Sequence, residues 1–443
     1  MKVERYQAYK DSEVNWLGKI PREWAIVRNK EIFKERSNLS TTGKETLLTV
    51  SHITGVTPRS EKNVNMFMAE TMEGYKICHQ GDLIINTMWA WMGALGTSNE
   101  LGICSPSYNV YMPIKGILYH HRYFDYLFRI PNAIVEMTRN SKGIVSSRLR
   151  LYAKDFFQIE TVLPSLKEQK TIARYLDTKT AQCDRKIDLL TQKATLYGKL
   201  KQSLINETVT SGLDKSVPMC DRGIEWLGEV PEHCGVKRLK DIIENLESGV
   251  SVNAANFPAQ NYENGVLKTS CVFRYGFDPN ENKAILPEEI SRAKCSPRKG
   301  NIIISRMNTP ELVGASGFVD RDYPNLFLPD RLWQTIFSRN VRIHSKWLSY
   351  LLLVTQLKEV ISFCATGSSP SMKNLSQENF LRIEILIPPL PEQKAIADYL
   401  DSKTAQINQI IQTINTQIEK LKELRKTLIN DAVTGKIRVT EHQ

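Results

Sequence analysis

The residue types that do chemistry in enzymes are present in this chain, but their spacing matches none of the common catalytic motifs. NTPE at 308–311 differs from the N-P-P-Y or D-P-P-Y motif of adenine methyltransferases. TTGKET at 41–46 lacks the first glycine and the final Ser/Thr of a phosphate-binding loop, so ATP binding is unsupported. The seven histidines form no H-E-x-x-H, and His120 and His121 beside an aromatic segment are expected to be structural. We therefore predict no catalysis, no metal site and no cofactor site in this chain. A self-contained DNA methyltransferase or nuclease with an unrecognised active site is the alternative.

The cysteines also lack a metal-binding pattern. Eight are scattered along the chain without a C-x-x-C pair or a Cys/His cluster: Cys78, Cys104, Cys183, Cys220, Cys234, Cys271, Cys295 and Cys364. Free thiols in a reducing compartment are the simplest interpretation. The N-terminal MKVERYQAYK is too polar for a secretory signal, and the apolar 347–357 is too short to span a bilayer and is expected to be a buried helix. We expect a soluble, cytoplasmic protein with no membrane partner.

Size and charge suggest several domains and an acidic partner. A chain of 443 residues is long enough for two to four domains, each with its own core. A formal net charge of +11 would attract a polyanion, because neutralised phosphates release their counterions. A merely basic protein fits the composition equally well.

The chain contains the same sequence pattern twice, which is the strongest signal in it. EQKTIARYLDTKTAQ at 168–182 returns as EQKAIADYLDSKTAQ at 392–406. Two further pairs of segments match: DSEVNWLGKIP at 11–21 with DRGIEWLGEVP at 221–231, and GDLIINTM at 81–88 with GNIIISRM at 300–307. The segments between them have diverged much more. Two similar domains with different recognition surfaces explain this pattern better than drift, which would spread the differences evenly.

The diverged middle segments favour an α+β fold. Short β-like runs at 82–85, 110–113 and 301–305 alternate with turn residues, and a helical pattern covers 119–128. We expect a curved or mixed sheet in each half.

Two long helices follow the repeated EQK segments. Apolar or small residues recur at alternating spacings of four and three, which predicts a coiled-coil seam. They are Cys183, Ile187, Leu190, Ala194, Tyr197 and Leu204 in the first copy, and Ile407, Ile411, Ile414, Ile418, Leu421 and Leu428 in the second. Lys201 and Arg425 take the same seam position, where long cationic stems are tolerated. The helices are expected to start near Glu168 and Pro391 and to stop at 210–212 and 434–436.

Some forty residues per helix would make a rod of roughly 60 Å. If the two helices pack antiparallel, the rod would hold two domains apart, at a distance that suits contacts about one DNA turn (roughly 34 Å) apart. The alternative is that each helix only completes the core of its own domain.

The polar residues of the repeated segment are predicted to bind a partner protein. Ile172, Ala173 and Leu176 can face inward, but most of the polar residues cannot, and Glu168 and Asp177 have no basic residue three or four positions later. The predicted partner-binding residues are Glu168, Gln169, Tyr175, Asp177 and Lys179, with Glu392, Gln393, Tyr399, Asp401 and Lys403 in the second copy. Slow drift is the alternative explanation for their identity.

The chain closely resembles the specificity subunit of type I restriction–modification systems. The resemblance rests on the WLGxxP segments near 11–21 and 221–231, which we call the heads, together with the EQKxIAxYLD segments and the heptad helices. The resemblance covers nearly the whole chain. It departs from the pattern at Lys167, where the second copy has Pro391, and at Cys234, where the first copy has Trp24. These departures affect local packing.

The resemblance implies two similar globular target recognition domains separated by two long antiparallel coiled-coil helices. The corresponding domains are 1–162, spacer helix 163–213, 214–386, and spacer helix with tail 387–443. Such a subunit has no catalysis of its own. It reads a bipartite site in double-stranded DNA and recruits two adenine methyltransferase subunits and a motor–nuclease subunit. S-adenosylmethionine, ATP and Mg are expected in those partners and no cofactor in this chain.

Residues that contact DNA are expected in the irregular parts of the two middle segments, where basic and polar residues gather beside a glycine. In the first half they are Trp89, Trp91, Tyr108, Asn109, Lys142, Ser146, Arg148 and Arg150, and in the second half Arg306, Asn308, Arg331, Ser368, Ser369 and Lys373. Arg or Asn among them could read base edges in the major groove. Each could instead be a solvated surface residue, and Trp89 and Trp91 could belong to the core.

Overall fold

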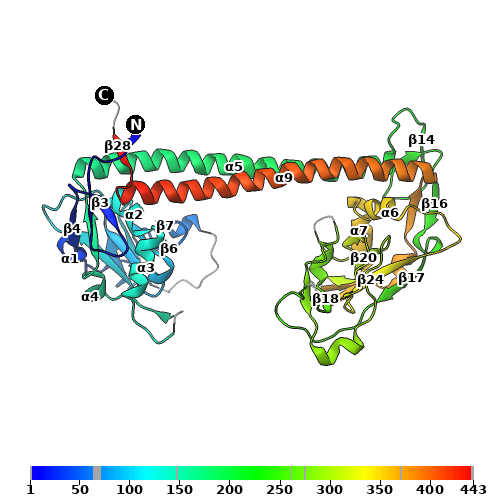
Figure 1. The fold of residues 1–443 in the computed structure, drawn as a ribbon, viewed down its shortest axis with the longest axis horizontal. Helices are drawn as coiled ribbons and strands as arrows, with labels where there is room; N and C mark the ends of the chain where they lie inside the picture. The colour runs from blue at the N-terminus through cyan, green and yellow to red at the C-terminus, as the bar shows by residue number, and fades with distance from the viewer. Residues whose placement is uncertain are drawn as a thin grey trace. The chain divides into compact units, whose positions relative to one another are not determined.

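The computed structural model describes residues 2–62, 71–145, 148–260, 262–273, 276–369 and 372–440. The chain divides into two compact units (Figure 1). The first unit contains residues 1–191 and 415–443, and the second contains residues 192–414. Each unit is therefore built from a globular part and from stretches of both long helices.

Both units contain the same central four-stranded antiparallel sheet. In the first unit the strand order is β10 (Leu95–Thr97), β9 (Leu83–Asn86), β12 (Tyr108–Pro113), β5 (Phe33–Glu35). In the second unit it is β22 (Ser316–Phe318), β20 (Ile302–Ser305), β24 (Leu332–Phe337), β17 (Ile243–Ser248). The repeated strands GDLIINTM and GNIIISRM become β9 and β20, and both are fully buried. The repeat in sequence is thus a repeat in topology.

The WLGxxP heads form the same small strand arrangement in each unit. The pairs are β2 (Tyr9–Asp11) with β3 (Lys19–Pro21) and β4 (Ala25–Arg28) with β13 (Glu160–Leu163), matched by β14 (Met219–Asp221) with β15 (Glu229–Pro231) and β16 (Gly235–Arg238) with β27 (Glu384–Ile387). The indole Nε1 of Trp16 donates to the carbonyl of Glu160 at 3.1 Å, and that of Trp226 donates to Glu384 at 3.2 Å. The repeated tryptophan therefore fastens each head to the strand that leads into a long helix.

Short helices cover the central sheets. They are α1 (Asn29–Ile32), α2 (His121–Phe128), α3 (Pro131–Arg139) and α4 (Ala153–Phe156) in the first unit, and α6 (Ser345–Leu351), α7 (Thr355–Cys364) and α8 (Gln377–Leu381) in the second. Phe156 and Phe380, which the repeat aligns, both lie in the core at 0% exposure.

The prediction of one buried helix over 347–357 is wrong in part. The segment forms α6 and α7, which are bent by 78° because the backbone is extended at Val354 (φ −61°, ψ 130°). Trp347, Leu351 and Leu357 are nevertheless fully buried. Within the described residues, no single helix is long and apolar enough to cross a membrane. The bent pair α6 and α7 is long and apolar enough only when its two helices are taken together.

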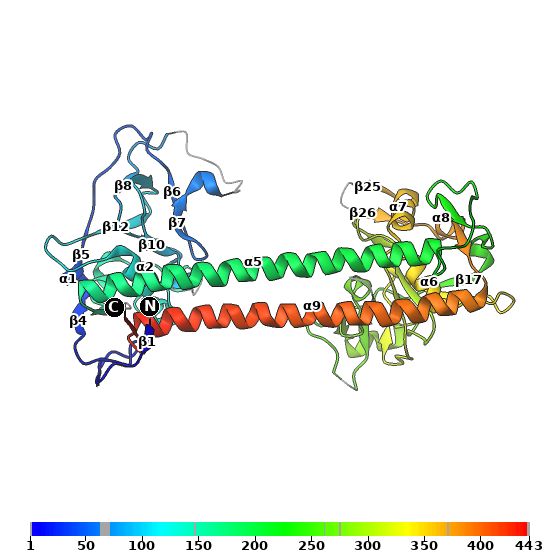
Figure 2. The ribbon, with the colours of Figure 1, turned by 90° about the horizontal axis from the view of Figure 1, so that it is seen from above.

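The two long helices are α5 (Leu166–Ser211) and α9 (Leu390–Val433), close to the bounds that the sequence predicts. In the first unit Arg425 Nε lies 3.0 Å from Asp184 Oδ1, and Leu176 shares a core with Ala432 and Val433. In the second unit the helices also run antiparallel, with Lys201 Nζ donating to Asn408 Oδ1 at 2.9 Å (Figure 2).

The predicted seam is the inner face of this pairing. All its positions are buried or half-buried, including Lys201 at 5% exposure. The fold class of two similar α+β parts and two long antiparallel helices is confirmed.

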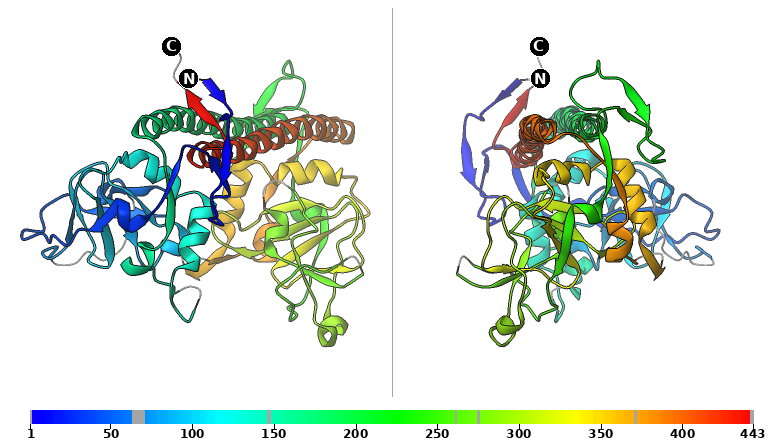
Figure 3. Two further views of the ribbon diagram at one scale, coloured as in Figure 1. Left: turned by 60° about the vertical axis from the view of Figure 1, so that its left-hand side comes forward. Right: turned by 90° about the vertical axis from the view of Figure 1, so that its right-hand side faces the viewer.

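The remaining strands differ between the units. The first unit adds β6 (Leu48–Ser51) with β7 (Gly55–Pro58), β8 (Lys76–Cys78) with β11 (Gly102–Cys104), and β1 (Lys2–Glu4) with β28 (Arg438–Thr440), which pairs the two ends of the chain (Figure 3). The second unit adds a sheet in which β18 (Gly265–Leu267) pairs antiparallel with β19 (Asn282–Ala284) and parallel with β23 (Leu326–Phe327). It also adds a sheet in which β26 (Met372–Asn374) pairs antiparallel with β21 (Met307–Asn308) and with β25 (Thr366–Ser369). The divergence in sequence therefore corresponds to different outer strands on a shared inner sheet.

Candidate nucleic-acid interface and helix junctions

In the first unit the predicted DNA-contacting residues gather where β9 ends. Trp89 is 49% exposed, and Trp91 is half-buried with its Nε1 donating to the carbonyl of Met88 at 3.0 Å. Neither indole belongs to the core, so the alternative of two core tryptophans is wrong. Arg150 Nη2 lies 3.9 Å from Met88 Sδ, which brings the 142–150 hairpin against this turn.

The described residues between 142 and 150 include exposed cationic and apolar side chains. Lys142 and Arg150 pair across the base of this segment, and a Cβ at Gly143 would lie 2.9 Å from the carbonyl oxygen of Arg148. The close approach of the two strands therefore requires a glycine. Arg148 is exposed, Lys142 Nζ lies 2.8 Å from Asp155 Oδ1, and Ser146 lies outside the described residues.

Tyr108 and Asn109 lie on β12, next to this turn. Tyr108 pairs with Asn86 at the end of β9, and burial raises the pKa of its half-buried hydroxyl. The Asn109 amide donates to the hydroxyl of Tyr111 at 3.1 Å. That contact already occupies one of the amide's donors, which weakens Asn109 as a base-reading residue.

In the second unit the predicted residues meet at the corresponding place, where β20 ends. The Arg306 amide donates to the Arg331 carbonyl at 3.0 Å, and Asn308 pairs with Lys373 across β21 and β26. Arg331 is exposed, whereas the Arg306 guanidinium lies 5.6 Å from the ring centroid of Trp333.

The other members of this group make contacts of their own. Lys373 Nζ donates to the Ser362 carbonyl at 2.9 Å, and the Asn308 amide donates to Ser305 Oγ at 3.2 Å. The backbones of Ser368 and Ser369 form part of β25. A Cβ at Gly367 would lie 2.4 Å from the Met372 carbonyl oxygen, so Gly367 plays the same part in its hairpin as Gly143 does in the first unit.

We call the end of β9 with residues 142–150 the corner of the first sheet, and the end of β20 with β21, β25 and β26 the corner of the second. The two corners are equivalent in topology but carry different side chains. Sequence reasoning missed the exposed apolar residues there: Ile144 is fully exposed (105%) in the first unit and Phe363 is 89% exposed in the second. Their residue type suggests a core position, and only the exposure in the folded chain separates them from core residues. Together with Arg148 and Arg331 they make each corner both cationic and apolar.

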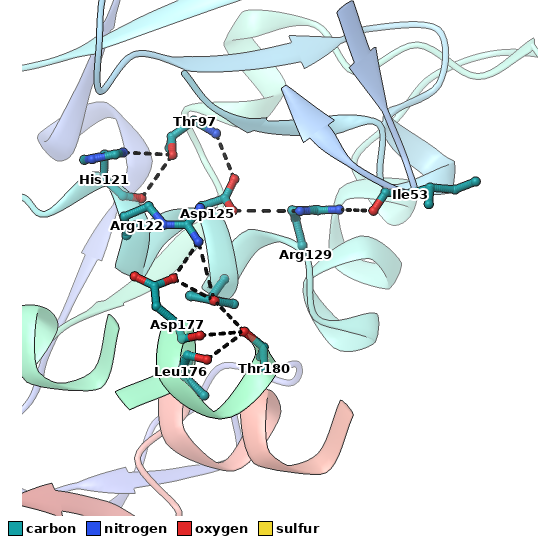
Figure 4. A network of polar contacts seen from close by, with 10 residues as sticks. Ile53, Thr97, His121, Arg122, Asp125, Arg129, Leu176, Asp177 and Thr180 are labelled. Carbon is teal, nitrogen blue, oxygen red and sulfur yellow. Dashed lines mark hydrogen bonds and ion pairs between the residues drawn. The ribbon is translucent and has the colours of Figure 1, made fainter. Parts of the chain in front are cut away.

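Several polar residues of the repeated segments 168–182 and 392–406, the junction segments, contact the globular parts. Asp177 Oδ1 accepts from Arg122 Nη2 at 2.6 Å and from the hydroxyl of Tyr126 at 2.9 Å, and Tyr126 also contacts Thr180 Oγ1 at 3.2 Å (Figure 4). Arg122 continues the network to Asp125, whose Oδ1 accepts from the Thr97 amide at 3.0 Å. The network links α5, α2 and β10.

The second unit repeats this arrangement. Asp401 Oδ1 accepts from the Tyr350 hydroxyl at 2.5 Å and lies 3.3 Å from Lys346 Nζ, and Tyr350 contacts Thr404 Oγ1 at 3.2 Å. Burial, reinforced by the hydrogen bond to Asp401, raises the pKa of Tyr350 above its ordinary value. The tyrosine therefore stays a hydrogen-bond donor at every physiological pH.

The repeated glutamines are buried. Gln169 Oε1 accepts from the His120 amide at 2.9 Å, and Gln393 Oε1 accepts from the His344 amide at the same distance. The Nε2 groups donate to the carbonyls of Pro164 and Pro388, both at 2.9 Å. Each glutamine ties the first turn of a long helix to the chain that precedes a short helix.

The repeated glutamates have intramolecular partners as well. Glu168 Oε1 accepts from Trp24 Nε1 and from the Tyr6 hydroxyl, both at 3.2 Å, and Glu392 Oε2 lies 2.6 Å from His233 Nε2. The premise that the repeated polar residues are unpartnered is therefore wrong for the acids and the glutamines. The premise that they are exposed is wrong for the glutamines, whereas the side chains of Asp177 and Asp401 stay 44% and 46% exposed. A search three and four positions along the helix cannot find partners that tertiary packing supplies.

The remaining predicted partner-binding residues differ in exposure. Tyr175 is buried at 5% exposure and Tyr399 is half-buried. Lys403 is exposed and lies 5.8 Å from the Tyr399 ring centroid, and Lys179 is half-buried, 3.5 Å from Gln182 Oε1. A partner could thus reach the lysines and also the partly exposed carboxylates of Asp177 and Asp401. Whether the set contacts another subunit stays a prediction.

Two topologically equivalent α+β units, each with a cationic corner and each fastened to a long helix, make this an internally duplicated protein. Residues 231–420 match the family model described as the type I restriction modification DNA specificity domain.

Two curated relatives are similar over much of their length. The MjaVIII specificity subunit of Methanocaldococcus jannaschii is 27% identical over 72% of this chain and 70% of its own length. The EcoKI specificity subunit of Escherichia coli is 22% identical over 64% of this chain and 58% of its own.

Solved structures share the fold. One of them describes complex assembly and conformational transition of the type I R-M system. A chain of that structure matches 94% of this chain and 98% of its own length, with a TM-score of 0.66 and 16% identity. The HsdS subunit from Thermoanaerobacter tengcongensis has the same coverage and identity with a TM-score of 0.51. This chain is therefore similar in sequence and in fold to specificity subunits of type I restriction–modification systems, the family that its motifs resemble.

Proposed function

We propose that this chain reads a bipartite site in double-stranded DNA, one half with each unit, and recruits two adenine methyltransferase subunits and the motor–nuclease subunit of a type I complex. The proposal assigns 1–162 and 214–386 to two target recognition domains, and 163–213 and 387–443 to the spacer helices. S-adenosylmethionine, ATP and Mg would then be bound by the partners, and the complex would act in the cytoplasm.

One observation carries this proposal. The ends of β9 and β20 occupy the same place in two sheets of identical strand order, yet the residues that follow them differ. Trp89 and Arg150 lie at the first corner, and Arg306 and Arg331 lie at the second. A duplicated scaffold with unlike side chains at equivalent positions suits the reading of two unlike half-sites.

The chemistry of both corners suits a duplex. Exposed guanidinium groups such as those of Arg148 and Arg331 neutralise phosphates or donate bidentately to guanine. A Cβ at Gly143 or Gly367 would meet a carbonyl oxygen at 2.9 or 2.4 Å, so the backbone passes closely at both places. Exposed Trp89 and Phe363 offer apolar area for thymine methyl groups or for stacking.

Deletion of the gene followed by sequencing of N6-methyladenine across the host genome tests this function. We expect one bipartite methylation motif to disappear, and affinity purification of the chain to recover a methyltransferase subunit. Loss of no motif and recovery of no methyltransferase would contradict the proposal.

The purified chain alone gives the complementary test. Incubated with DNA, Mg and S-adenosylmethionine, it should neither methylate nor cut DNA. Either product would favour the alternative of a self-contained methyltransferase or nuclease.

A further inference from the structure

The contact between head and helix differs in one respect between the units. In the first unit Trp24 Nε1 donates to Glu168 on the first turn of α5 at 3.2 Å. The second unit has Cys234 in place of this tryptophan, preceded by His233, and both lie near Glu392 on the first turn of α9. A bulky donor has thus been replaced by two side chains that are common metal ligands.

The three side chains converge. Among the described residues, His233, Cys234 and Glu392 are the one group of three or more His, Cys, Asp or Glu whose ligand atoms all lie within 4.8 Å of one another. Cys234 is 2% exposed, whereas the side chains of His233 and Glu392 are 37% and 24% exposed. The thiol thus lies at the base of the group, and the imidazole and the carboxylate lie at its open side.

The end of α5 closes the group from another direction. Gly212 is buried, and a Cβ there would lie 2.8 Å from Glu392 Oε1. Its φ of +73° also favours glycine. The backbone at Gly212 therefore passes directly against the carboxylate and restricts the directions in which Glu392 can turn.

The donor set of imidazole nitrogen, thiolate sulfur and carboxylate oxygen is typical of Zn²⁺, which takes four tetrahedral ligands and leaves one position to water when the protein provides three. Tetrahedral bonds of about 2.0–2.3 Å place neighbouring donors roughly 3.3–3.8 Å apart. His233 Nε2 and Glu392 Oε2 are now 2.6 Å apart. Both side chains are partly exposed, so the small opening that a cation requires needs no change in the backbone.

Metal binding at this group would displace the thiol proton of Cys234 to solvent, because the thiolate and not the thiol is the ligand. The cation would then balance the negative charges of the thiolate and of Glu392.

We propose that His233, Cys234 and Glu392 form a binding site for a zinc-class divalent cation, which fastens the head of the second unit to the start of α9. The first unit achieves the same fastening with the indole of Trp24. The site is structural, and it is independent of which DNA sequence the chain reads.

Cobalt substitution gives the most specific test. The full-length chain, treated with a chelator and then titrated with Co²⁺, should bind one equivalent and develop the ultraviolet charge-transfer band of a cobalt–thiolate bond. Cys234→Ser should abolish the band, and His233→Ala should weaken Co²⁺ and Zn²⁺ binding at least tenfold. Cys220→Ser is the matched control, because Cys220 lies on the neighbouring β14 and is outside the group, so this variant should keep the band.

The wild-type spectrum decides the question even if a variant fails to fold. Absence of a thiolate band in the wild-type chain, or a band that Cys234→Ser retains, would overturn the proposal. Zn²⁺ should also raise the unfolding temperature of the wild-type chain and of Cys220→Ser, and should raise that of His233→Ala less at the same Zn²⁺ concentration. An equal rise in all three would mean that zinc binds elsewhere.

Discussion

Replacing the buried glutamine of the second junction by leucine separates an internal role of the repeated segment from a docking role. Gln393 is 1% exposed, and its side chain accepts from the His344 amide and donates to the Pro388 carbonyl, both at 2.9 Å. Leucine has a similar volume but forms neither hydrogen bond. The variant therefore leaves one amide and one carbonyl without a partner in a largely buried place.

The expected cost follows from these two groups. A buried polar group left without its partner costs about 1–3 kcal/mol, and the amide of His344 is only partly buried. We expect Gln393→Leu to lower the free energy of unfolding of the second unit by about 2–4 kcal/mol. Gln169→Leu should do the same in the first unit, because Gln169 makes the equivalent contacts and a third one, to the Leu118 carbonyl at 3.0 Å.

Urea denaturation of the full-length chain, followed by tryptophan fluorescence, measures this effect. Lys394→Ala is the matched control, because the neighbouring Lys394 is exposed and its removal should change stability by less than about 0.5 kcal/mol. If Gln393→Leu unfolded like the wild-type chain yet no longer recovered a methyltransferase subunit, the internal role of Gln393 would be refuted and the docking role favoured.

Three further predictions follow from particular contacts. Arg331→Ala should weaken DNA binding by the purified complex and, if Arg331 neutralises one phosphate, should reduce the slope of log affinity against log salt by about 0.9. The control is Arg382→Ala, because Arg382 is also exposed but lies 2.5 Å from Glu378. An unchanged slope and affinity would remove Arg331 from the interface. Gly367→Val should impair DNA binding more than Gly276→Val does. A Cβ at Gly367 would lie 2.4 Å from the Met372 carbonyl oxygen, whereas nothing lies within 4 Å of a Cβ at Gly276. Equal effects of the two substitutions would contradict the close approach of Gly367 to Met372. Burial lowers the pKa of Lys201 below its ordinary 10.5, so between the two pKa values the folded chain binds fewer protons than the unfolded chain. The free energy of unfolding should therefore rise with pH through that window in the wild-type chain but not in Lys201→Met. Parallel pH profiles of the two chains would refute this role of Lys201.

Sequence periodicity was sufficient to predict the long helices and their seam. Ile407, Ile414 and Ile418 are buried where the heptad pattern places them, because the spacing of four and three is a property of the helix itself. The repeat also predicted that β9 and β20 would be equivalent strands, since buried strands of the same pattern follow a glycine turn in both halves.

The role of the repeated polar residues could not be predicted in this way. Gln169 and Asp177 have polar character and a helical position that suggest exposure, but their partners lie 49 to 55 residues away in sequence, on the backbone of His120 and the side chains of Arg122 and Tyr126. Such contacts depend on how α2 packs against α5. The same limit applies to Ile144, whose full exposure is a property of the folded chain and not of its residue type.

The central claim is that each unit reads its own half of the DNA site. Exchanging residues 34–142 for those of a relative with a different specificity, and sequencing the N6-methyladenine of a host that carries the hybrid chain with its partner subunits, tests this claim most directly. We predict that one half of the methylated motif changes, while the other half and the gap between them stay the same. A hybrid that altered both halves of the motif would contradict independent recognition by the two units.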